Sequence, residues 1–304
     1  MSGLSSSCKT DRLWRMRLGF YLVAAVVLVT LGTSDSGKGG SPLGEVAGHW
    51  HFFFIGVLAA TVANSTGAGG GIVFLPVFTL LGLSVTESLA TSLAIQSFGM
   101  TAGGLSWLQH LHRGAIVDAQ SQSFRRILLV GGCGSLLGLR MAQEFISDPV
   151  WNVEWLFSVF SLVVGLVILV GTLKGSGVNG GREDGIRPGE LAGLAGCGFV
   201  GGAITAWLSI GVGEMLAIYL LALRFRVNLA VAVAVCVTSI TVITGVPFYF
   251  GKSAIVLEVL VFAAPGALIG GTLARHLAIF LGARRLKLGM AGWIILTAIV
   301  YLIV

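Results

Sequence analysis

Apolar residues fill long stretches of this chain, with few polar positions inside them. Unbroken apolar runs cover residues 18–32, 88–108, 127–142, 155–173, 227–250, 254–274 and 286–304. Most of them approach the ~20 residues that an α-helix needs to cross the hydrocarbon core of a bilayer. Backbone groups without hydrogen bonds are costly in lipid, so such runs must be helical. The pattern therefore predicts an all-α polytopic membrane protein.

Two further apolar runs, 52–83 and 191–223, are each interrupted near the middle by glycine and small polar residues. The first break contains Asn64, Ser65, Thr66, Gly67, Gly69, Gly70 and Gly71, and the second contains Ser209, Gly211, Gly213 and Glu214. Irregular backbone at membrane depth is tolerated only inside protein or beside water. Paired breaks at matching places in two halves of a membrane protein indicate a transport site.

The basic residues predict how the chain crosses the membrane. Most of the 19 lysines and arginines fall on one side if each broken run begins and ends on the same side, as a re-entrant hairpin or two short spans. The positive-inside rule then places the N-terminus in the cytoplasm, segment 33–51 outside, and the C-terminus outside. In this topology the first hairpin enters from outside and the second from the cytoplasm. We expect the protein in the inner or plasma membrane.

The same topology divides the chain into two inverted repeats, each a broken hairpin followed by three transmembrane helices. The repeats cover 52–173 and 190–304, and a glycine-rich charged stretch, 174–189, reads as the cytoplasmic linker between them. An offset of 142 residues pairs Gly69 with Gly211, Gly71 with Gly213, Ala90 with Ala232, and Ser97 with Ser239. Residues 1–33 lie outside the repeat and hold an extra N-terminal hydrophobic helix, either a signal anchor or a further transmembrane helix.

Composition excludes several classes of protein. With 55% hydrophobic and 11% charged residues, the chain cannot bury its apolar side chains in a water-soluble core. The net charge of +6 is explained by orientation in the bilayer, so we expect the lipid bilayer and no nucleic acid as a partner. The 4 cysteines lack metal-type spacing, and no phosphate-binding loop or nucleophile elbow is visible. The sequence predicts no enzyme, no cofactor and no metal site.

The breaks have the chemistry of an anion site. A helix that begins inside the membrane directs free N–H groups and the positive end of its dipole toward the break. Two such helix starts, near Gly71 and Gly213, would meet at the midplane and bind a small anionic solute. Further lining is expected from polar residues about mid-depth in the next spans, namely Gln96, Ser97, Thr238 and Ser239. The alternative is that the glycines permit close packing and the hydroxyls bond nearby carbonyl groups.

Glu214 is the one carboxyl group at a predicted break. An ionisable residue at membrane depth is costly and is a functional candidate. Beside an anion, Glu214 could carry a proton together with the substrate and repel the anion once ionised. Its other possible role is to cap the N-terminus of its own half-helix, where a carboxylate is favourable. The sequence leaves both roles open.

The first break and its surroundings resemble the TauE/SafE family of sulfite and organosulfonate exporters. The resemblance rests on the stretch from Gly67 to Val77, on Ala90-Thr91-Ser92, and on Ser209 to Glu214 with the segment 235–239. It implies a permease that moves a small sulfur-containing anion outward without ATP. Two alternatives remain: a cation or metal-ion permease using Glu214, Asn64 and Ser65, and a membrane scaffold without transport.

Overall fold

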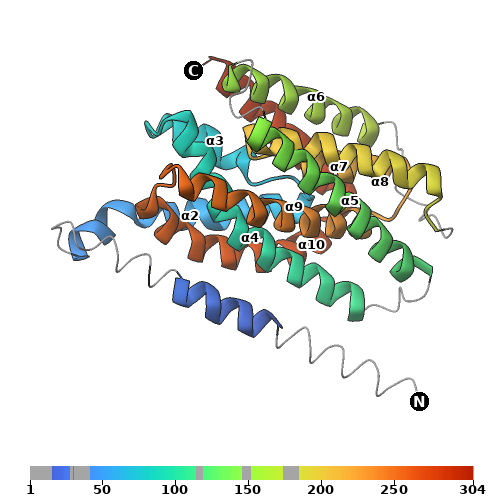
Figure 1. The fold of residues 1–304 in the computed structure, drawn as a ribbon, viewed down its shortest axis with the longest axis horizontal. Coiled ribbons are helices and arrows are strands. Elements are labelled where there is room, and N and C mark those ends of the chain that lie inside the picture. The colour runs from blue at the N-terminus through green and yellow to red at the C-terminus, as the bar shows by residue number, and fades with distance from the viewer. Residues whose placement is uncertain are drawn as a thin grey trace.

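The computed structural model describes residues 16–27, 30, 42–113, 119–145, 152–173 and 185–303. These residues are almost entirely helical, and no strand occurs among them, so the predicted all-α class is confirmed. In chain order the helices are Met16–Val27, α2 (Pro42–Thr66), α3 (Gly71–Leu80), α4 (Val85–Arg113), α5 (Ala119–Phe145), α6 (Val153–Leu173), α7 (Pro188–Leu208), α8 (Val212–Ala222), α9 (Val227–Gly251) and α10 (Leu257–Ile303) (Figure 1). Most of the predicted linker 174–189, and the chain before residue 16, lie outside the described residues.

Four described helices are long and apolar enough to cross a membrane: α6, α7, α9 and the first part of α10, Leu257–Gly282. Shorter apolar helices are Met16–Val27, α3 and α8. This agrees with the predicted polytopic membrane protein.

Both broken runs fold as hairpins. In the first, α3 returns beside α2, so that the rings of Phe78 and Phe52 lie 6.1 Å apart. In the second, α8 returns beside α7, and the Tyr219 hydroxyl donates to the Glu190 carbonyl oxygen at 2.9 Å. Each hairpin therefore begins and ends at the same end of the molecule.

The two arms of each hairpin differ in length. The first arms, α2 and α7, have 25 and 21 residues, whereas α3 and α8 have 10 and 11. At ~1.5 Å per residue, a return arm is ~15 Å long, half the thickness of the hydrocarbon core. The first arm is longer than the sequence indicated, because α2 begins at Pro42 and continues through Asn64, Ser65 and Thr66.

Each long arm packs on a helix from the other half of the chain, with glycine at the contacts. On α10, a Cβ added to Gly266 would be 2.0 Å from the Phe53 carbonyl oxygen of α2. On α5, a Cβ added to Gly138 would be 1.8 Å from the Phe199 carbonyl oxygen of α7. Small residues allow such close backbone approach in membrane bundles. Thus α2 of the first half packs on α10 of the second, and α7 of the second half packs on α5 of the first.

Helices α4 and α9 pack against each other between these pairs. The hydroxyls of Thr101 and Ser239 lie 2.7 Å apart, and a Cβ on Gly104 would be 3.5 Å from Cys236 Sγ. Residue numbers rise on α4 as they fall on α9, so the two helices run antiparallel.

Gly282 divides α10 into two helices. Its φ of 72° and ψ of 161° lie in a region that is essentially restricted to glycine. The second part turns back onto α6, where Gly165 faces Ala291 and Ile294. The sequence predicted separate spans at 254–274 and 286–304, and the structure joins them by this kink instead of a loop.

Basic residues gather at one end of the bundle. Arg17, at the start of the first helix, donates to Gln109 near the end of α4. Arg275 of α10 donates to Ser106 of α4 at 3.1 Å. At the same end, Phe124 of α5 belongs to a cluster that also contains Val227, the first residue of α9. These are the helix ends that the charge pattern assigned to one side of the membrane.

Candidate functional site

Glycine lets the chain leave the helix at both breaks. Gly67, directly after α2, has a φ of 84°, and Gly211, directly before α8, has a φ of 135°. Residues with a Cβ atom rarely adopt these conformations, whereas glycine adopts them readily. Ser209, at the end of α7, also has a positive φ of 57°. The residues of the breaks therefore set where α2 and α7 end.

The two breaks lie in direct backbone contact, as expected from the sequence. A Cβ atom added to Gly213 would be 2.1 Å from the carbonyl oxygen of Gly67. One added to Gly71 would be 2.6 Å from the carbonyl oxygen of Ser209. Side chains at Gly71 and Gly213 would push the breaks apart. Glycine at these two positions brings the starts of α3 and α8 together.

The Glu214 carboxylate connects the two breaks. Its side chain is only 1% exposed. One carboxylate oxygen accepts the N–H of Gly69 and the other accepts the N–H of Gly211, each at 2.8 Å. The second bond caps the start of α8, as the sequence analysis considered. The bond to Gly69 extends the cap to the other half of the chain, which local sequence reasoning did not anticipate.

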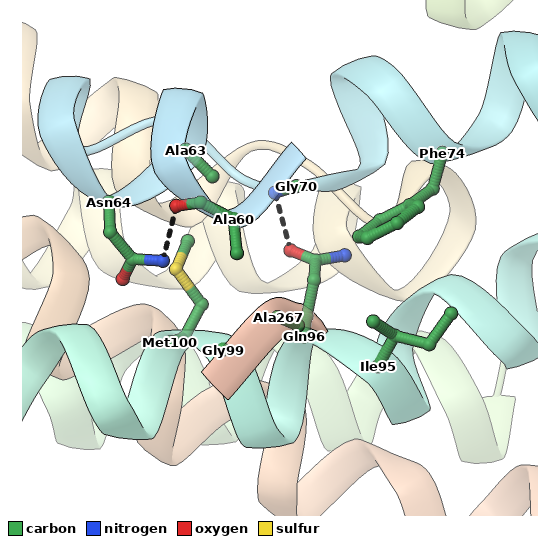
Figure 2. Close-up of a pocket in the computed structure, with 10 residues that line it drawn as sticks. All are labelled: Ala60, Ala63, Asn64, Gly70, Phe74, Ile95, Gln96, Gly99, Met100 and Ala267. Atoms are coloured by element: carbon green, nitrogen blue, oxygen red, sulfur yellow. Dashed lines mark hydrogen bonds between the residues drawn. The ribbon is translucent and has the colours of Figure 1, made fainter. Parts of the chain in front are cut away.

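Gln96 of α4 makes a second connection at the breaks. Its side-chain oxygen accepts the N–H of Gly70 at 2.7 Å (Figure 2). Its side-chain nitrogen donates to the Ser209 hydroxyl at 2.6 Å and to the Ser92 hydroxyl at 3.0 Å. The sequence predicted Gln96 and Ser209 as site residues but not Ser92, whose signals are a hydroxyl one helical turn before Gln96 and its place in the stretch Ala90-Thr91-Ser92 that carries the family resemblance.

Several peptide N–H groups at the breaks already have acceptors within the protein. Besides the bonds to Glu214 and Gln96, the Ala68 N–H donates to the Thr66 hydroxyl at 3.2 Å. The Val212 N–H donates to the Thr205 hydroxyl at 3.1 Å. At these N–H groups an incoming anion would have to replace a side chain, and the Glu214 carboxylate is the acceptor that most resembles it.

Asn64 lies in the last turn of α2, beside a small cavity. Its side-chain nitrogen donates to the Ala60 carbonyl oxygen at 2.8 Å, while its side-chain oxygen has no partner in the described part of the chain (Figure 2). The cavity, which Gly70 and Gln96 also line, leaves about 10 Å³ for the centre of a water molecule. That volume is about the minimum for one water. It is too small for a sulfur oxyanion.

Three predicted hydroxyls bond carbonyl oxygens of their own helices. Ser65 and Thr66 donate to Val62 at 2.9 and 2.8 Å, and Ser97 donates to Ala94 at 2.6 Å. These bonds are the ones that the packing alternative expected. In this structure Ser65 and Ser97 are thus not directed at the contact between the breaks.

Thr238 and Ser239 lie on α9 in different surroundings. Ser239 pairs with Thr101, whereas the Thr238 hydroxyl is buried without a partner among the described residues. A Cβ on Gly213 would be 2.8 Å from that hydroxyl. Thr238 therefore faces the start of α8.

No group of three or more His, Cys, Asp or Glu residues that could hold a metal ion occurs in the described part of the chain. The charged chemistry at the breaks consists of one carboxylate and the peptide N–H groups around it.

Comparison with known families identifies the protein's relatives. A family model described as sulfite exporter TauE/SafE matches residues 52–301, which include both breaks, the second hairpin and the first hairpin from residue 52 onward. The chain belongs to this family. Searches among curated proteins and solved structures gave no match. Membership in the TauE/SafE family, together with the apolar helices, makes the protein an integral multi-pass membrane protein of a transporter family.

Proposed function

We propose that this TauE/SafE-family protein is a secondary transporter that exports a small sulfur-containing anion, such as sulfite or an organosulfonate, without ATP. One observation carries the proposal: N–H groups from two breaks in opposite halves of the chain bind the same buried carboxylate, that of Glu214. Helix starts attract negative charge through these groups and through their dipoles. A sulfite or sulfonate group presents similar oxygens and would take the place of the carboxylate.

Replacement of the Glu214 carboxylate by the anion would couple anion transport to the binding of a proton. The ionised carboxylate holds the N–H groups of Gly69 and Gly211 by charge-assisted hydrogen bonds, which are stronger than neutral ones. A proton on Glu214 weakens this hold and frees the donors for the anion. Proton and anion then bind together. A doubly charged sulfite leaving with one proton carries one net negative charge, and an inside-negative potential drives it outward by about 2.3 kcal/mol per 100 mV.

The packing of the helices supports two inverted repeats around this site. The offset of 142 residues that aligns the breaks also aligns α4 with α9, and these two helices run antiparallel. It likewise relates the pair α2 and α10 to the pair α7 and α5, and both pairs are packed through glycine. Inverted repeats of this kind provide alternating access around a midplane site in other transporters.

The charge pattern supports an orientation for the bundle. The basic end, defined by Arg17, Arg275 and the neighbouring ends of α4 and α10, faces the cytoplasm under the positive-inside rule. The hairpin of α7 and α8 then enters from the cytoplasm, and the hairpin of α2 and α3 from the opposite side. We expect the protein in the inner or plasma membrane, with its C-terminus outside.

The contacts of Glu214 favour an anion over a cation as substrate. A cation would need free carboxylate oxygens, because hard cations bind to oxygen ligands. Both Glu214 oxygens instead face N–H donors, whose positive ends repel a cation.

Purified protein in liposomes tests the proposal. We expect uptake of labelled sulfite that is inhibited by unlabelled sulfonates but not by divalent cations. Its rate should depend on pH in the native protein and lose most of that dependence in Glu214→Gln. Inhibition by divalent cations alone would support cation transport, and no flux of either ion would support a scaffold. An unchanged pH profile in Glu214→Gln would remove the proton-coupling mechanism while leaving anion transport in place.

A further inference from the structure

A second cavity reaches the breaks from the basic end of the bundle. Its inner wall contains Thr66, at the end of α2, and Glu214. Its other end contains Val227, at the start of α9, and Lys287 of α10. About 30 Å³ is available to the centre of a water molecule, three times the value beside Asn64. This cavity therefore has a larger volume than the one beside Asn64.

Lys287 and Glu214 are the two charged residues that line this cavity, and the rest of its wall is almost entirely apolar. The kink at Gly282 brings Lys287 there, because it turns the second part of α10 back toward α6. Lys287 is partly buried, whereas the neighbouring Arg284 and Arg285 are exposed. A single lysine thus lies apart from the two arginines that follow the kink.

We propose that this cavity is the passage by which the anionic substrate reaches Glu214 from the cytoplasm, and that Lys287 is a positioning residue that attracts the anion into it. The inference rests on the proposed anion transport. It adds the route that the anion takes and the positively charged side chain that attracts it. The occupant is a small oxyanion with a sulfite or sulfonate group.

The physical argument depends on the apolar walls of the cavity. Charges interact more strongly where water is scarce, so one ammonium group there raises the local concentration of anions and lowers that of cations. The exposed Arg284 and Arg285 are screened by water and salt and have less influence inside. Lys287 also offsets the charge of Glu214, which would otherwise repel an approaching anion.

Transport measurements in liposomes provide the first test. We expect Lys287→Gln to raise the half-saturating sulfite concentration about tenfold, because a unit charge that lines a largely apolar cavity is poorly screened and attracts an anion strongly. The maximal rate should change little, and Lys287→Arg should restore the native value. The matched control is Arg284→Gln, which removes an exposed charge three residues away and should leave the half-saturating concentration unchanged. Equal effects of the two Gln variants would overturn a specific role for Lys287.

A labelling experiment tests the passage without any transport. In a background lacking the 4 native cysteines, Ile218→Cys places a thiol on the cavity wall. We expect an anionic methanethiosulfonate reagent to label it faster than a cationic one, and Lys287→Gln to reduce this ratio about tenfold. No labelling by either reagent would show that water does not enter, and an unchanged ratio would show that Lys287 does not set the field. Either result overturns this inference even if sulfite transport is measured, whereas normal labelling without sulfite transport would contradict the proposed function alone.

Discussion

The two breaks have the same backbone plan but different chemistry. Both have a residue with positive φ directly after the first arm, Gly67 and Ser209, and a glycine at the closest contact, Gly71 and Gly213. The repeat offset pairs Glu214 with Ile72, and Gln96 with Thr238. Glu214 of the second half accepts a hydrogen bond from the first half, and Gln96 of the first half donates to Ser209 of the second. The two halves thus share a backbone arrangement, but Glu214 occurs only in the second half and Gln96 only in the first. The site therefore contains a single carboxylate.

This asymmetry has a consequence for transport. A symmetrical pair of carboxylates would repel an anion twice and bind two protons. In the mechanism that we propose, one carboxylate shared between two helix starts would instead permit a one-for-one exchange, in which one proton releases the donors for one anion.

The strongest test of the comparison removes the unique carboxylate. Glu214→Ala leaves the N–H groups of Gly69 and Gly211 buried without acceptors, and each such group costs about 1 to 3 kcal/mol. We expect the unfolding free energy in detergent to fall by about 2 to 5 kcal/mol, with sulfite transport lost. Ile72→Ala at the corresponding position should lose only apolar contacts and retain the pH dependence of transport. Equal loss of that pH dependence in both variants would contradict the asymmetric site.

The next largest effect is expected at the contact glycines that both breaks have in common. Gly213→Ala places a Cβ atom 2.1 Å from the Gly67 carbonyl oxygen, and Gly71→Ala places one 2.6 Å from that of Ser209. Such overpacking costs about 1 to 3 kcal/mol, so both variants should be less stable in thermal unfolding. Gly196→Ala is the matched control, because nothing lies within 4 Å of its added Cβ. A stability loss in the control as large as in the two variants would mean that the contact between the breaks is unimportant.

The smallest effects sharpen the comparison between Gln96 and Thr238. Gln96→Leu removes the acceptor of the Gly70 N–H and should lower the unfolding free energy by about 1 to 2 kcal/mol. Thr238→Val removes a hydroxyl that has no partner among the described residues, so stability should change by less than about 0.5 kcal/mol. If Thr238 contacts the anion, the Val variant will bind sulfite more weakly at unchanged stability. If the Val variant binds sulfite as tightly as the native protein does, Thr238 does not contact the anion.

The sequence was sufficient to predict the helical class and the positions of both breaks, and it singled out Glu214 as a candidate. These features follow from local patterns, namely apolar length, glycine at membrane depth and a lone carboxyl group. The kink at Gly282 was not predicted, because a glycine between two apolar runs indicates a loop as well as a kink. The start of α2 at Pro42 was also missed, since the residues before Phe52 are less apolar.

The individual hydrogen bonds between the halves were beyond sequence reasoning. The bond from Gly69 to Glu214 joins residues 145 positions apart, and no local pattern specifies it. Ser92 and Lys287 were missed for a related reason. In a membrane helix both the lipid-facing and the packed faces are apolar, so periodicity does not reveal which side chains face the interior.

The pairing of α2 with α10 has a consequence for how the protein is made. Thr61 of α2 bonds the Gly270 carbonyl oxygen, 209 positions later in the chain. A ribosome must therefore synthesise most of the polypeptide before α2 meets the surface against which it rests. Until then its glycine-lined face remains in contact with lipid or with the insertion machinery, and a chain terminated before α10 would leave the earliest hairpin without its support.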